Sequence, residues 1–236
     1  LRQRRYNFSE GFYAMANAEY YGLTGKQEHL ERARRAYNLI WDLNHGLMAD
    51  PTGMGPKTIA ATRTGRALAD PMIYLNLTAT LRRVDPDWAD TYNQRAKQCV
   101  SDIFTYHRKP DMHCTLESVG PSGEFMDEFT AGRVVNPGHV IECSWFLMEE
   151  AERLHDNQLM EDTLSMYRDA IEAGWDKEYG GLLYFLDCLG KPPEAYEHDM
   201  KLWWPHNEGM IASLMAYRHT GDEYYLRWFN KLLAYC

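Results

Sequence analysis

Hydrophobic residues recur every three to four positions in eight segments of the chain, and these segments come in pairs. This spacing predicts amphipathic α-helices. In each pair the first segment is more apolar than the second, and short turns such as Thr24-Gly25 and Thr220-Gly221 separate them. The predicted pairs are 11–21 with 30–43, 72–81 with 88–106, 141–154 with 160–173, and 210–217 with 224–235. The sequence therefore predicts a repeated helical hairpin of about 60 to 70 residues.

The difference between the two helices of a hairpin predicts an all-α protein with an inner and an outer ring of helices. The long connections follow the second helix of each pair, so they fall on one rim. The connection 50–56 is rich in turn residues, and the connections 120–135 and 179–191 contain stretches that predict small hairpins of strands. Because sites gather on loops held by a rigid scaffold, we expect the functional site on this rim.

Residues 201–210 concentrate chemical groups at the start of a predicted helix. Pro205 fits a first helical turn, so the side chains of Trp204 and Glu208 should project from the helix entrance. Indole faces beside a carboxylate suit a sugar ring, because apolar C–H faces stack on the aromatic ring and hydroxyls bond to the acid. The alternative is a helix start with a buried tryptophan pair, Trp203 and Trp204.

A second group of polar residues follows Asn136-Pro137-Gly138, which ends the preceding segment. His139 should begin a helix, and Glu142, three residues later, should share its face. An imidazole oriented by a carboxylate is a candidate general base with a pKa near neutrality. The alternative is a capping histidine beside a solvated glutamate.

Charge and cysteine content narrow the function classes. The net charge of −9 and the pI near 5.5 argue against nucleic acid or an anionic membrane as the main partner. Five cysteines without paired spacing, and no leader sequence, indicate a reducing cytoplasm. His107, Asp111, His113 and Cys114 have a spacing possible for a metal, but a polar surface cluster is the favoured interpretation, so no metal site is predicted.

Together the two motif stretches resemble the N-acylglucosamine 2-epimerase family, which includes the renin-binding proteins and, more distantly, the cellobiose 2-epimerases. The resemblance extends from about Arg5 to Cys236. The matching elements, in chain order, are Phe8-Ser9-Glu10-Gly11-Phe12-Tyr13-Ala14-Met15-Ala16, Pro137 to Glu142, Trp175-Asp176, Gly180 to Phe185, Lys201 to His206 with Glu208, and Thr220-Gly221-Asp222.

The resemblance implies an (α/α)6 barrel of twelve helices. This sequence would supply about four of its six hairpins, so we expect residues 1–236 to form a single (α/α) barrel domain, truncated at both ends relative to the family. The resemblance also implies that no cofactor is required, that ATP acts as an activator, and that the protein forms a homodimer.

The resemblance assigns catalytic roles to three residues. His139 is one of two acid/base imidazoles, Glu208 supports substrate binding and ring opening, and Glu142 orients His139 or the sugar. The second imidazole and an arginine that meets the substrate oxygen would lie outside this sequence. Trp203 is expected in the core. The remaining candidates for substrate contact are Trp204, His206, Lys201, Asn76 and Glu10. For Lys201, a salt bridge to a neighbouring helix is the commoner alternative.

The expected activity is interconversion of N-acetylglucosamine and N-acetylmannosamine by proton removal and return at C2 of the open-chain sugar. Cellobiose-type relatives carry a histidine in the pattern around Asn76, and this sequence lacks it. This difference favours a monosaccharide amino sugar over a disaccharide as the substrate. Three alternatives stay open: an aldose–ketose isomerase, a glycosidase that uses Glu142 and Glu208 as its two carboxylates, and a binding protein without catalysis.

Overall fold

Eight α-helices dominate the computed structural model, which describes residues 8–49 and 65–236. The all-α prediction is confirmed, and every predicted helix is present, with longer bounds in all cases except the helix predicted over 88–106. The connection 50–56 lies outside the described residues. The helices are α1 (Phe8–Thr24), α2 (Gln27–Asn44), α3 (Ala69–Val84), α4 (Ala89–Asp102), α5 (Pro137–Leu154), α6 (Asn157–Gly174), α7 (Trp203–Thr220) and α8 (Glu223–Tyr235).

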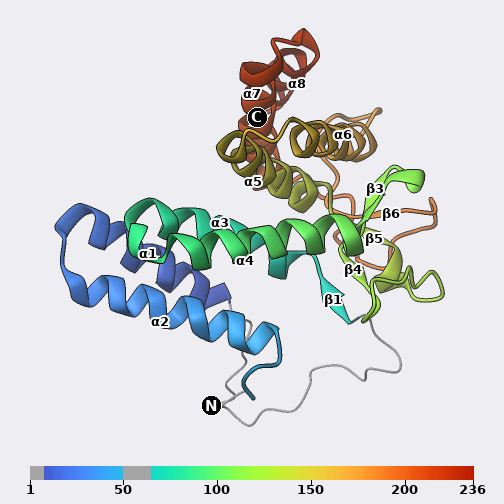
Figure 1. The fold of residues 1–236 in the computed structure, drawn as a ribbon. Coiled ribbons are helices and arrows are strands. Elements are labelled where there is room, and N and C mark those ends of the chain that lie inside the picture. Colours follow the sequence, from blue (N-terminus) through green and yellow to red (C-terminus); the bar gives the residue numbers. More distant parts are fainter. Residues whose placement is uncertain (1–7, 50–64) are drawn as a thin grey trace. The chain divides into compact units, whose positions relative to one another are not determined.

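Contacts divide the chain into two compact units, and each is described by itself. Unit 1 comprises Leu1–Ile59 and Asp70–Ser101, and unit 2 comprises Ala60–Ala69 and Asp102–Cys236. The hairpins α1–α2, α5–α6 and α7–α8 pack as predicted (Figure 1). The expectation of a single domain over residues 1–236 stays a prediction.

Three buried tyrosines form the centre of unit 1. The rings of Tyr37 on α2 and Tyr74 on α3 stack at 4.6 Å, and Tyr92 on α4 meets Tyr37 edge-on at 5.2 Å. Such aromatic pairs add to the stability that burial of their apolar surface provides. Their hydroxyls are also satisfied, since the Tyr37 hydroxyl bonds Thr78 and the Tyr92 hydroxyl donates to Asp85.

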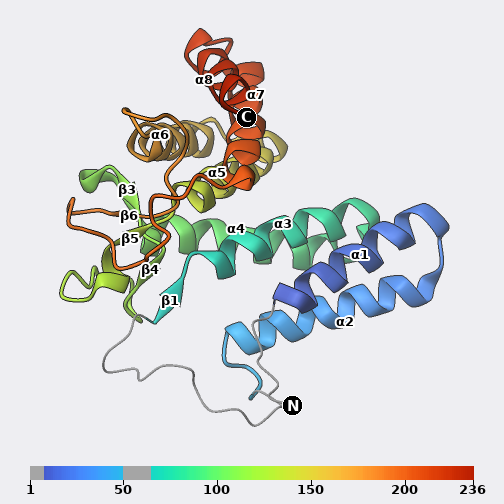
Figure 2. The same cartoon turned by 180° about the vertical axis from the view of Figure 1, so that it is seen from behind.

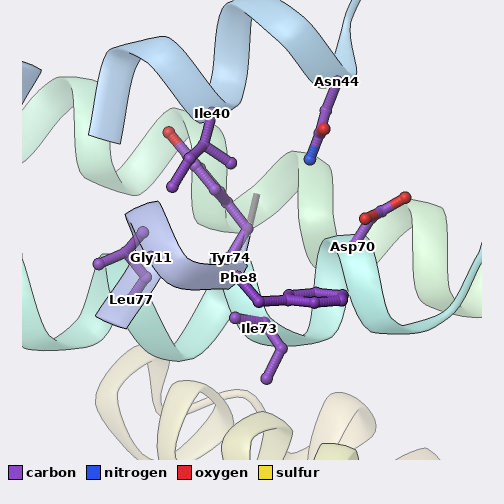
Figure 3. A pocket seen from close by; sticks show the side chains of 8 residues that line it. All are labelled: Phe8, Gly11, Ile40, Asn44, Asp70, Ile73, Tyr74 and Leu77. Carbon is purple, nitrogen blue, oxygen red and sulfur yellow. The ribbon is translucent and has the colours of Figure 1, made fainter. Parts of the chain in front are cut away.

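A small pocket in unit 1 lies between α1, α2 and α3 (Figure 3). Its lining is mainly apolar, with Asn44 and Asp70 as its polar groups. The cavity offers about 10 Å³, which is roughly the room of one water molecule. It is therefore too small for a sugar.

In unit 2, helix α5 packs against both α6 and α7, and α8 packs against α7 (Figures 1 and 2). Side chains cap the starts of three of these helices. Asn136, Asp156 and Asp222 each accept a backbone N–H from the first turn of α5, α6 and α8. Caps of this type satisfy donors that the helix leaves unpaired.

The predicted hairpins in the long loops are wrong in their pairing. Strand β5 (Val134–Val135) of the first loop pairs with β6 (Leu186–Asp187) of the second, so the two loops join each other. Arg133 reinforces this junction by donating to the buried carboxylate of Asp187 at 2.8 Å. The other pairs are β1 (Arg66–Ala67) with β4 (Ser118–Val119), and β2 (Arg108–Lys109) with β3 (Cys114–Thr115).

The helix predicted over 88–106 ends early as an α-helix. It changes at Asp102 into a π-helical turn, Ile103–His107. At the end of this turn His107 is buried, and its Nδ1 bonds the carbonyl oxygen of Leu116 at 2.9 Å. The turn thus connects the α4 segment to the strand region from which the candidate site is built.

Candidate active site

His139 lies in the first turn of α5, where local sequence fixes its backbone. Pro137 occupies the first turn, where a missing N–H costs nothing. The side chain of Asn136 accepts the backbone N–H of His139 at 3.1 Å. The imidazole itself is 28% exposed, so one of its edges remains accessible to a small molecule.

Glu117 holds the imidazole of His139. Both of its carboxylate oxygens lie 3.0 Å from Nδ1 of that ring. Glu117 sits between β3 and β4, with its N–H donating to Val134 and its carbonyl accepting from Leu68. Since a carboxylate accepts, Nδ1 carries the proton. Nε2 is then the ring atom that can exchange a proton with a substrate.

The charges around His139 favour its protonated form. Burial alone would lower the pKa of His139, but the hydrogen bond and charge of Glu117, together with the charge of Glu142, raise it above its ordinary value. Glu142 therefore acts on His139 through its charge, while the orienting hydrogen bond comes from Glu117. The other part of the expectation, that Glu142 meets the sugar, stays a prediction.

Two glutamates on facing helices, Glu142 on α5 and Glu208 on α7, share the environment of His139. Burial first, and then the charge of Glu208, raise the pKa of Glu142 to about 7. Burial also raises the pKa of Glu208, whose carboxylate accepts the indole N–H of Trp145 at 2.6 Å. At neutral pH Glu142 therefore keeps a proton in a large fraction of molecules, whereas an exposed carboxyl group would release it.

Trp204 forms an aromatic wall beside the imidazole. Its ring centroid lies 5.3 Å from that of His139, and Tyr184 meets it edge-on at 6.4 Å. The ring also covers Gly138, where a Cβ would come within 2.6 Å of it. Only glycine lets the indole approach the helix start so closely. The two motif stretches therefore meet through direct α5–α7 packing.

His206 is placed differently from its predicted role in substrate contact. It is 1% exposed, Nδ1 donates to the Leu202 carbonyl at 2.6 Å, and Nε2 accepts the Leu182 N–H at 2.9 Å. Its ring also stacks on Tyr235. Both nitrogens are thus used inside the protein, and His206 ties the start of α7 to the preceding loop.

Lys201 and Trp203 also differ from a sugar-contacting arrangement. Lys201 forms a salt bridge with Asp176 at 2.7 Å, as the alternative for it predicted, but this partner lies in the loop after α6 and not on a neighbouring helix. Trp203 was expected in the core, but it is 75% exposed. The helix begins one residue before Trp204, so the latter turns inward and Trp203 outward.

Glu10 and Asn76 lie in unit 1. Glu10 is in the first turn of α1 and Asn76 is on α3, and both are partly buried. Neither lines the small pocket of that unit. Their contact with a substrate at His139 stays a prediction.

Of the four residues predicted to form a surface cluster, Asp111 and His113 are exposed, whereas His107 and Cys114 are buried. His113 belongs to an ion-pair network. Asp169 accepts from Arg108 at 2.5 Å and lies 3.3 Å from the exposed His113 ring. Across residues 8–49 and 65–236, no three His, Cys, Asp or Glu side chains are grouped as metal ligands.

In the described part of the chain, no helix has both the length and the apolar character that crossing a bilayer requires.

Sequence reasoning missed Glu117 and Trp145. Glu117 is separated from His139 by 22 residues and follows no helical period. Its one signal is its place in the stretch Cys114-Thr115-Leu116-Glu117-Ser118-Val119, where a lone acid interrupts residues suited to strands. Trp145 lies within the predicted helix 141–154, where the helical pattern gives no sign that its indole N–H donates to Glu208 on α7.

Comparison with solved structures defines the class of fold. The structure of cellobiose 2-epimerase from Bacillus thermoamylovorans matches with a TM-score of 0.80 and 19% identity, over 97% of this chain and 59% of that chain. A D-mannose isomerase structure matches with a TM-score of 0.74 and 20% identity, over 97% of this chain and 58% of that chain. The fold is therefore that of the (α/α)6 barrel proteins.

Sequence comparison identifies the family. The model of the N-acylglucosamine 2-epimerase family matches residues 2–236, and the chain belongs to this family. N-acylglucosamine 2-epimerase of Rattus norvegicus is 35% identical over 236 residues, all of this chain and 55% of the relative. The chain thus spans about half the length of the curated relatives that it matches.

Replacing Glu117 should lower the pKa of His139. In Glu117→Gln the side chain keeps its size but loses the negative charge that raises this pKa, so burial should dominate. An NMR titration of the histidine Cε1 protons measures the change. The control is Glu149→Gln, at an exposed site on α5, the helix that carries His139. This variant should leave the titration of His139 unchanged. An unaltered His139 pKa in Glu117→Gln would contradict the assigned pair.

Removing His206 should destabilise the protein rather than weaken a sugar contact. His206→Ala leaves a buried N–H and a buried carbonyl unpaired and creates a cavity, at a cost of about 2–4 kcal/mol in the free energy of unfolding. Urea denaturation measures this cost, and the exposed His219→Ala on the same helix should change stability by less than about 0.5 kcal/mol. A variant of unchanged stability would restore the substrate-contact role.

Proposed function

We propose that this chain carries the catalytic imidazole of a sugar 2-epimerase that interconverts N-acetylglucosamine and N-acetylmannosamine. The observation that supports it most is the His139–Glu117 pair, in which Nδ1 is bound and Nε2 is left for proton transfer. The family membership and the names of the relatives supply the reaction class and the amino sugar.

His139 would take part in proton transfer at C2 of the open-chain sugar. A C–H next to an aldehyde is acidic because the resulting carbanion is delocalised onto the carbonyl oxygen as an enolate. Neutral imidazole accepts this proton at Nε2, and the charge of Glu117 stabilises the imidazolium that forms. The strong hydrogen bond at Nδ1 would keep the ring in the same orientation while the C2 proton is removed and while a proton is returned.

Glu142 and Glu208 would act on the oxygens of the substrate. With a pKa of about 7, Glu142 is a carboxylic acid in a large fraction of molecules at neutral pH. A protonated carboxyl group can donate a hydrogen bond to an oxygen on which negative charge develops. Glu208, whose carboxylate accepts the indole N–H of Trp145, would accept from a sugar hydroxyl.

Trp204 would supply the apolar contact for the sugar ring. Its indole is half-buried and lies beside the imidazole, so a ring stacked on it would present a carbon to His139. Inversion at C2 also needs a second group on the opposite face. The buried His206 does not offer one. The cytoplasmic location expected from the cysteine content, and the homodimer and activation by ATP expected from the family, belong to the same proposal.

Solvent exchange at C2 tests this function. Each sugar is incubated with the chain in D2O, and proton NMR follows the C2 proton. A single working imidazole should replace the C2 proton by deuterium, and a complete pair of bases should also produce the other epimer. The exchange rate should rise with pH through the raised pKa of His139, since only the neutral ring accepts a proton.

His139→Gln should reduce the exchange rate by about 100-fold or more, in line with the usual contribution of general acid–base catalysis. Glu149→Gln is the surface control and should retain the rate. With a sugar whose C2 carries a hydroxyl, such as mannose, appearance of the ketose would instead indicate an isomerase, and cleavage of glycosides without C2 exchange would indicate a glycosidase. Exchange that persists in His139→Gln would contradict the assignment.

A further inference from the structure

Two cysteines of unit 2 lie together although 73 residues separate them in the sequence. Cys114 belongs to β3, and Cys188 directly follows β6. Both line one cavity of about 240 Å³ between these strands and α6. The other cysteines lie elsewhere: Cys99 is buried on α4, Cys143 is buried on α5, and Cys236 is exposed after α8.

The two thiols line the same cavity and lie close enough for each to alter the pKa of the other. Burial, followed by the nearness of Cys188, raises the pKa of Cys114 to about 12. Burial and the charge of Asp187 raise the pKa of Cys188 as well, whereas the nearby thiol of Cys114 lowers it. Cys188 is therefore the thiol that ionises first.

The solvent exposure of the two cysteines also indicates that Cys188 reacts before Cys114. Cys188 is partly exposed and Cys114 is buried, and both face the same cavity. A small disulfide would therefore reach Cys188 first. The backbone positions are fixed, because the Cys188 N–H donates to Arg133 at 2.8 Å and the carbonyl of Cys114 accepts from Arg108 at 3.3 Å.

We propose that Cys114 and Cys188 form a dithiol site that undergoes exchange with small disulfides of the glutathione class and closes to an internal disulfide. Cys188 is the nucleophile and Cys114 is the resolving thiol, and both line the same cavity. The site does not depend on the proposed epimerase activity, because neither sulfur contacts His139 or the glutamates around it.

The reaction balances without a further reactant. The Cys188 thiolate attacks one sulfur of the small disulfide, the S–S bond breaks, and the first glutathione thiol leaves with the proton that Cys188 gave up. The Cys114 thiol then loses its proton and attacks the Cys188 sulfur, which releases the second glutathione thiol. Two protein thiols are oxidised, and one small disulfide is reduced to two thiols.

The internal bond would join the two loop segments that position the candidate site. Cys114 is three residues before Glu117, and β6 pairs with β5, which leads into Asn136 and His139. A covalent link restricts the separation of such segments. The backbone amide of Glu117 should therefore exchange its hydrogen more slowly in the oxidised protein than in the reduced one.

Thiol mapping tests the proposal on the full chain with Cys236→Ser, which removes the exposed competing thiol. The folded protein is treated with oxidised glutathione, unfolded in iodoacetamide, digested and analysed by mass spectrometry. We expect a peptide pair linked through Cys114 and Cys188, with Cys99 and Cys143 alkylated. Adding Cys114→Ser should leave glutathione bound to Cys188, and adding Cys188→Ser should leave Cys114 reduced.

Circular dichroism establishes that each variant is folded. The main readout, the linked peptide in the Cys236→Ser protein, tests the proposal even if a further variant does not fold. A glutathione adduct that persists on Cys188 beside an alkylated Cys114 would overturn the proposal. So would two unreacted thiols, or links that involve Cys99 or Cys143 to the same extent. None of these outcomes bears on C2 exchange, so the two proposals fail separately.

Discussion

The hydrogen bond between Glu117 and Nδ1 of His139 is the constraint on which the candidate site depends. Glu117 is held by backbone bonds to Val134 and Leu68, so its carboxylate is fixed by strand structure rather than by a flexible loop. His139 is fixed independently by the capped start of α5. The two segments meet at one geometry, and this geometry decides which ring nitrogen carries a proton and which one can react.

The surrounding groups follow from that pair. An imidazole beside a carboxylate favours positive charge, and nearby Glu142 and Glu208 would add negative charge in a partly buried place. Burial raises the pKa of both glutamates, to about 7 for Glu142, so the cluster carries less negative charge than exposed carboxylates would. Trp145 and Trp204 restrict water around it, which strengthens each of these interactions. Proton transfer between a substrate and His139 would therefore change the net charge of the site only modestly.

Local patterns predicted the helices and part of the site, because both arise from short-range spacing. The helical period gave all eight helices, and Pro137 with Asn136 gave the start of α5. Glu117 could not be found in this way, since strand pairing between distant loops brings it to His139. His206 and Trp203 show the same limit: the register of the first turn of α7, set by tertiary packing, decided that His206 is buried and that Trp203 faces solvent.

The protonation of the two ring nitrogens of His139 tests this account most directly. Two-bond proton–nitrogen NMR correlations of the neutral ring, recorded at a pH above its pKa, report which nitrogen bears hydrogen. The account predicts the Nδ1–H form, with Nε2 as the unprotonated nitrogen, because Glu117 accepts at Nδ1. A ring in the Nε2–H form would contradict the account, since Nε2 could not then remove a proton from the sugar.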